Sequence, residues 1–80
     1  MSISEAVAQR ILGLCKERNI TVNKLCTISA VTQSTVNDIV NNKAKNTGIV
    51  TIKKLCDGLG ITVEDFFSHE TFRNLEQEIK

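Results

Sequence analysis

Four side chains between residues 33 and 38 carry amide, hydroxyl and carboxylate groups at a spacing that places them on one face of a helix: Gln33, Ser34, Asn37 and Asp38. Amides pair bidentately with adenine N6 and N7, a hydroxyl donates or accepts, and a carboxylate accepts from cytosine N4. These side chains have the chemistry of a base-reading surface. The alternative interpretation is an ordinary solvated helix face.

Patterns typical of catalysis or metal binding are not evident in the sequence. Cys15, Cys26 and Cys56 are widely spaced without a CxxC pair, and each lies at an apolar helical position, which predicts reduced, buried thiols. His69 has no ligand partner at metal-site spacing. There is neither a Ser/His/Asp set nor a phosphate-binding glycine loop. We therefore expect no enzyme activity, no cofactor, no metal and no small-molecule substrate.

Length and composition favour one small helical domain. The chain has 80 residues, of which 41% are hydrophobic, and it lacks Pro, Trp and Tyr. That composition is poor in strand-forming aromatics and turn residues, so an all-α fold is predicted. No apolar run of about 18 residues occurs, and charged residues interrupt the first twenty positions. We expect no membrane partner and a cytoplasmic location.

The formal net charge of +1 conceals an uneven distribution. Residues 16–54 contain seven basic and two acidic residues, a net charge of +5. Residues 55–80 contain six acidic and two basic residues, a net charge of −4. The attractive field for an anionic partner therefore lies in the middle of the chain.

Apolar periodicity and capping residues predict five helices. The first runs to about Arg18 with Ser4 as N-cap; the others cover residues 22–29, 33–41, 49–59 and about 63–67. Thr21, Thr32 and Thr62 are the predicted caps of three of these. The segment 41–48 is a polar loop. The spacing of Phe72, Leu75 and Ile79 allows an additional C-terminal helix, either packed on the domain or forming a dimer contact.

The same periodicity separates inward from outward positions. Val36, Ile39 and Val40 are expected to face the core from the third helix. In the fourth helix the inward set is Ile49, Ile52, Leu55, Cys56 and Leu59, with Lys53 and Lys54 outward. Phe66 and Phe67 should close the core, with one of them left for a partner.

Two short helices joined by about three residues inside a small helical domain are typical of a helix-turn-helix, here over residues 22–41. The chain resembles the Cro and phage-repressor (Xre-type, lambda-repressor-like) family over residues 10–67. The matching residues include Lys16-Glu17-Arg18, Leu25-Cys26, Gln33-Ser34-Thr35-Val36 and Leu59-Gly60-Ile61-Thr62-Val63-Glu64-Asp65-Phe66-Phe67. The resemblance implies an all-α, five-helix DNA-binding domain over residues 1–67, followed by a helical tail over residues 68–80.

The resemblance also implies a site and a function. Helix 33–41 becomes the recognition helix, with Gln33, Ser34, Asn37 and Asp38 as base readers. The implied phosphate contacts are Thr21, Asn23, Thr35, Asn41, Asn42, Lys43 and Lys45. The implied activity is that of a sequence-specific transcriptional regulator, a repressor, which binds a double-stranded DNA operator as a homodimer. The alternative is a protein-protein interaction adaptor, or an antitoxin-like partner, built on the same fold.

Three positions depart from the family pattern. Many family members have a buried ion pair at the positions that correspond to Cys15 and Val40 here. Because both residues are apolar in this chain, we expect an apolar contact between them instead. A usual turn glycine is Ala30, so a positive φ there would carry strain of about 1 kcal/mol. Asp38 would repel phosphates, so it either reads a base or pairs with a basic side chain in the free protein.

Overall fold

The structure is a computed structural model that describes residues 1–79. Its first element is helix α1 (Ile3–Glu17). The Ser2 hydroxyl accepts a hydrogen bond from the Glu5 backbone N–H, and the Glu5 carboxylate accepts one from the Ser2 N–H. This reciprocal pair is a capping box, so the prediction that Ser4 caps the helix is wrong. The helix is closed at Arg18, and Asn19 follows with a left-handed φ of 56°.

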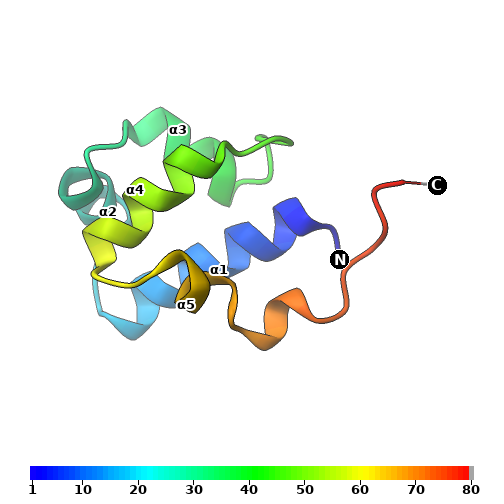
Figure 1. The fold of residues 1–80 in the computed structure, drawn as a ribbon. Helices are drawn as coiled ribbons and strands as arrows, with labels where there is room; N and C mark the ends of the chain where they lie inside the picture. Colours follow the sequence, from blue (N-terminus) through cyan, green and yellow to red (C-terminus); the bar gives the residue numbers. More distant parts are fainter. Residues whose placement is uncertain (80) are drawn as a thin grey trace.

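Helices α2 (Val22–Ser29) and α3 (Gln33–Val40) are joined by a three-residue turn and lie together at one end of the molecule (Figure 1). The Thr21 hydroxyl caps α2 as predicted. Ala30 has φ of 55°, so the condition under which this alanine would carry backbone strain is met. Thr32 occupies the N-cap position of α3, but its hydroxyl bonds to the Thr35 hydroxyl at 2.8 Å and caps no helix N–H.

Helix α4 (Ile49–Leu59) packs against α2, and α5 (Val63–Phe67) follows with Thr62 as its N-cap. Together the helices enclose one apolar core. Its buried members are Val7, Ile11, Leu14, Cys15, Leu25, Cys26, Val36, Ile39, Ile52, Leu55, Cys56, Leu59 and Phe66. Val40 packs against this cluster, which contains Cys15, so the direct contact between the two side chains stays a prediction.

The first turn of α4 departs from its predicted orientation. Ile49 was expected to face inward, yet 63% of its surface is exposed, and the adjacent Val50 is 65% exposed. The α4 members of the core begin one turn later, at Ile52. The prediction that Ile49 faces the core is therefore wrong, because within residues 1–79 no segment covers its side chain at the start of α4.

The predicted C-terminal helix is a second correction. Beyond α5 the chain forms one 3-10 turn, η1 (Glu70–Phe72), and residues 73–79 are irregular. The Glu76 N–H donates to the Met1 carbonyl at 3.0 Å. In a helix this N–H would instead donate to the carbonyl four residues earlier. Phe72 packs against Phe66 and Phe67, whereas Ile79 is exposed. The last predicted tail residue, Lys80, lies outside the described residues.

The all-α class with five helices is confirmed for residues 1–79, which contain no strand. Within the same residues, none of the helices has the length and apolar character required to cross a bilayer. Helix α3 lies at the top of the view in Figure 1, and its exposed face carries Gln33, Ser34, Asn37 and Asp38.

Candidate nucleic-acid interface

Helix α3 separates its apolar and polar residues as the sequence predicted. Val36 and Ile39 are buried, with at most 3% of their surfaces exposed. The predicted base readers all lie on the exposed side of the helix: Gln33, Ser34, Asn37 and Asp38. Within residues 1–79 Asp38 forms no ion pair, so the predicted partnership with a basic residue is not found there.

The seven predicted phosphate contacts are also exposed, and they come from three places in the fold: Thr21, Asn23, Thr35, Asn41, Asn42, Lys43 and Lys45. The Thr21 hydroxyl accepts from the Lys24 N–H at 3.0 Å at the start of α2. A hydroxyl that accepts one bond still has its own proton to donate. Thr21 can therefore cap α2 and donate to a phosphate oxygen at the same time.

The loop 41–48 is held on both sides by hydrogen bonds to its own backbone groups. The N–H groups of Lys43 and Ala44 both donate to the Asp38 carbonyl, at 2.8 and 3.0 Å. Asn42 supplies the reversal with a left-handed φ of 60°. On the other side, the Ser4 hydroxyl donates to the Lys45 carbonyl at 3.1 Å. The two lysines thus project from a fixed segment, and Ser4 has a role that its sequence position did not reveal.

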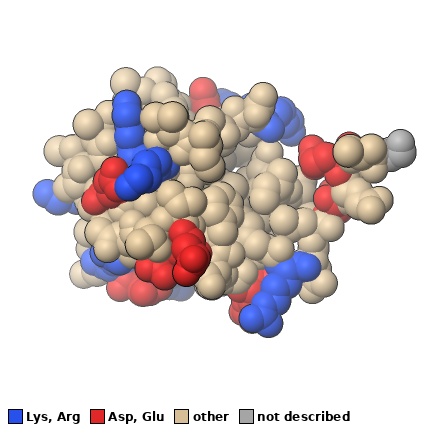
Figure 2. All heavy atoms as spheres, viewed as in Figure 1, with Lys and Arg blue, Asp and Glu red and all other residues tan. Residues whose placement is uncertain are grey.

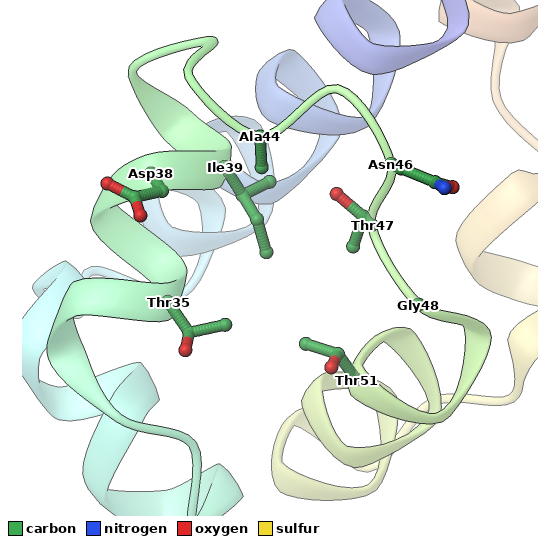
Figure 3. A pocket seen from close by; sticks show the side chains of 8 residues that line it. All are labelled: Thr35, Asp38, Ile39, Ala44, Asn46, Thr47, Gly48 and Thr51. Atoms are coloured by element: carbon green, nitrogen blue, oxygen red, sulfur yellow. The ribbon is translucent and has the colours of Figure 1, made fainter.

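A cavity of about 280 Å³ lies between α3, the loop 41–48 and the start of α4 (Figure 3). The side chains of Thr35 and Thr51 point toward each other across it, and Ile39 and Ala44 form its apolar wall. The Asp38 carboxylate points away from the cavity toward the outer side of α3. The sequence did not identify Thr51 as part of this cavity. The lining residues come from three separate segments, so no regular spacing along the chain connects them.

Several basic residues are engaged within the protein. The Arg10 guanidinium donates to the carbonyls of Asp65 and Phe66, at 2.9 and 2.8 Å. Arg18 donates to the Leu59 carbonyl at the end of α4, and Lys53 pairs with Asp57. Fewer basic side chains are therefore available to an anionic partner than the sequence contains. Lys43 and Lys45 are among those that remain available.

Apart from Asp38 on α3 itself, many of the acidic side chains lie around α5 and in the C-terminal tail. Figure 2 shows them over the lower part of the displayed face, where α5 lies in Figure 1, and along the C-terminal tail. The first turn of α5 contains Glu64 and Asp65, which suit the positive end of the helix. Figure 2 also shows red groups beside blue ones at the left and lower edges of this face, so acidic side chains are concentrated around α5 and the tail but are not confined there.

The cysteines belong to the core. Cys15, Cys26 and Cys56 are buried free thiols, and burial raises the pKa of each. A raised pKa keeps a thiol protonated and unreactive. Among the described residues, no three His, Cys, Asp or Glu side chains gather as a metal site would require.

Comparisons with known proteins agree with this geometry. A family model described as a Cro/C1-type helix-turn-helix DNA-binding domain matches residues 10–71. A crystal structure of prophage Lp1 protein 11 superposes with a TM-score of 0.80 and 34% sequence identity, covering 94% of this chain and all of that one. No curated protein sequence matches the chain.

Proposed function

Because the chain belongs to the family of Cro/C1-type helix-turn-helix DNA-binding domains, we propose that it is a sequence-specific transcriptional regulator that represses by occupying an operator. In this proposal α3 enters the major groove, and α2 lies across the backbone. No chemical step is required, because occupancy of the operator alone excludes other proteins from it.

The observation that carries the proposal is the polar face of α3. Four exposed side chains with base-pairing chemistry stand on one short helix whose opposite face is locked in the core. Gln33 and Asn37 can each pair with an adenine, and Asp38 can accept from a cytosine N4. Asp38 repels phosphate, so its place on this face favours sequence-dependent over indiscriminate binding.

The phosphate contacts position α3 without reading sequence. Lys43 and Lys45 supply charge from the loop 41–48, and Thr21 supplies a hydroxyl at the start of α2. Asn23, Thr35, Asn41 and Asn42 complete the proposed set. A homodimer would bind two half-sites about 34 Å apart, one helical turn of DNA.

Selection of bound fragments from random duplex DNA, repeated over a salt series, tests this function. We expect one enriched sequence and an affinity that falls steeply between low and physiological salt, because bound lysines release counterions. Enrichment of no sequence, together with binding that salt leaves unchanged, would contradict the proposal. That result would instead favour the protein-protein adaptor, or an antitoxin-like partner.

A further inference from the structure

Lys45 lies at the point of the loop 41–48 where helix α1 holds the backbone. The Ser4 hydroxyl, in the first turn of α1, donates to the Lys45 carbonyl at 3.1 Å. Within residues 1–79, residues 45–47 form no other hydrogen bond. This part of the loop therefore depends on one side chain that lies 41 positions earlier in the chain.

Packing alone does not hold residues 45–47 against α1. A hollow of about 130 Å³ lies where they face the helix, and its lining from α1 consists of Ile3, Ser4 and Val7. Side chains that border a hollow lose part of the dispersion contact that would hold two segments together. The hydrogen bond from Ser4 thus provides anchoring that the apolar contacts here leave incomplete.

The two lysines of the loop have different anchors. The Lys43 N–H donates to the Asp38 carbonyl, so Lys43 is placed by α3, whereas Lys45 is placed from α1. Both lysine side chains are exposed, and Lys45 forms no ion pair within residues 1–79. A change at Ser4 should therefore affect the position of Lys45 and leave that of Lys43 as it is.

We propose that Ser4 is a positioning residue for DNA binding, which directs Lys45 toward a phosphate by fixing the backbone of the loop. The inference rests on the proposed function, because it requires Lys45 to contact DNA. A lysine on an ordered loop loses less conformational freedom when it binds than a lysine on a loose one. Ser4 therefore raises the affinity for every duplex without contacting DNA itself, and its effect passes through Lys45.

Fluorescence anisotropy with a mixed-sequence DNA duplex at low salt tests this positioning. Ser4→Ala should raise the dissociation constant about three- to tenfold, which corresponds to the loss of one hydrogen bond. The same substitution should have almost no effect in a Lys45→Ala background and its full effect in a Lys43→Ala background. A general loss of stability would instead weaken binding in all backgrounds alike.

Two further variants control for the hydroxyl and for stability. Ser4→Thr keeps the hydroxyl, and the hollow beside Ser4 has room for the added methyl group, so the affinity should be retained. Thr62→Ala removes the hydroxyl that caps α5, at a position outside both the loop and the lining of the hollow. Thr62→Ala should lower the melting temperature, because a helix cap is lost, and leave the dissociation constant unchanged.

Nuclear magnetic relaxation of the free protein provides a measurement without DNA. The backbone order parameters of Asn46 and Thr47 should fall in Ser4→Ala and stay high in Ser4→Thr. Unchanged order parameters, or equal losses of affinity in the Lys45→Ala and Lys43→Ala backgrounds, overturn the inference while the proposed function stands. If the unmodified protein binds no duplex, the proposed function is refuted and the inference fails with it.

Discussion

Gln33 and Lys43 illustrate two kinds of contact that individual residues make with a nucleic acid. Gln33 is in the first turn of α3 on its exposed face, with an amide that can make two hydrogen bonds to one base edge. Lys43 projects from the loop after α3 and offers a charge that any phosphate can satisfy. Sequence preference therefore depends on the first residue, and general affinity depends on the second.

Gln33→Ala should weaken binding to the selected sequence by about 1–3 kcal/mol and leave binding to unrelated duplexes nearly unchanged. Lys43→Ala should weaken binding to all duplexes by a similar factor and make the salt dependence less steep. Fluorescence anisotropy with both duplexes over a salt series measures these effects. Equal losses on every sequence for Gln33→Ala would remove Gln33 from the base readers.

Ala30 is a residue whose backbone conformation conflicts with its type. Its φ of 55° lies in the left-handed region, where a Cβ costs on the order of 1 kcal/mol. Ala30→Gly should therefore raise the free energy of unfolding, partly offset by the greater flexibility of glycine in the unfolded chain. Urea unfolding measures the change. Ala44→Gly is the control, since Ala44 is not among the residues with positive φ, and it should give no gain.

At the scale of elements, α2 and α4 pack closely because Gly58 has no side chain. A Cβ added at Gly58 would stand 2.2 Å from the Ser29 Oγ and 3.0 Å from its Cα. Ser29 itself is buried, and within residues 1–79 its hydroxyl has no hydrogen-bond partner. At this contact, α2 and α4 pack closely although the Ser29 hydroxyl is left without a hydrogen bond.

Gly58→Ala should lower the free energy of unfolding by about 1–3 kcal/mol, because α2 and α4 must move apart. Gly13→Ala provides the matched control: it also lies in a helix, but nothing stands within 4 Å of its added Cβ. This control should raise stability by about 0.5–1 kcal/mol through better helix propensity. Thermal or urea unfolding compares the two. A Gly58→Ala protein as stable as the unmodified one would mean that the helices adjust without cost.

For the molecule as a whole, the arrangement of charge matters more than its sum. A net charge of +1 suggests little attraction to DNA, yet the basic loop 41–48 and the acidic α5 and tail are separate regions. Arg18 and Lys53 are engaged within the protein, which reduces the charge that can reach a phosphate. Such a molecule should rely on oriented binding through α3 and its loop.

Replacing the two tail carboxylates Glu76 and Glu78 by glutamine should raise affinity for all duplexes at low salt. The reason is that two negative charges no longer repel the DNA. The gain should disappear at high salt, where such long-range repulsion is screened. Filter binding at two salt concentrations measures it. A gain that persists at high salt, or that depends on sequence, would indicate a direct contact by the tail.

Local rules located most of the helices and the polar face of α3. Thr21, Thr62 and the apolar periodicity placed α2, α4 and α5 in the positions where they are found, because caps and periodicity act within a few residues. The same rules were wrong at Ser4 and in the tail. Ser2 and Glu5 form a reciprocal cap that a search for one hydroxyl misses, and the Glu76 N–H bonds to a residue at the other chain end.

The sequence by itself determined the fold class, the helix-turn-helix and the residues of the exposed α3 face, because these depend on spacing along one helix. Only the tertiary structure decided which basic residues are engaged within the protein and that the Ser4 hydroxyl holds the loop 41–48. Those features join segments far apart in the chain. Ile49 has the periodicity of a core residue, and the absence of any covering segment within residues 1–79 becomes visible only when the helices are packed.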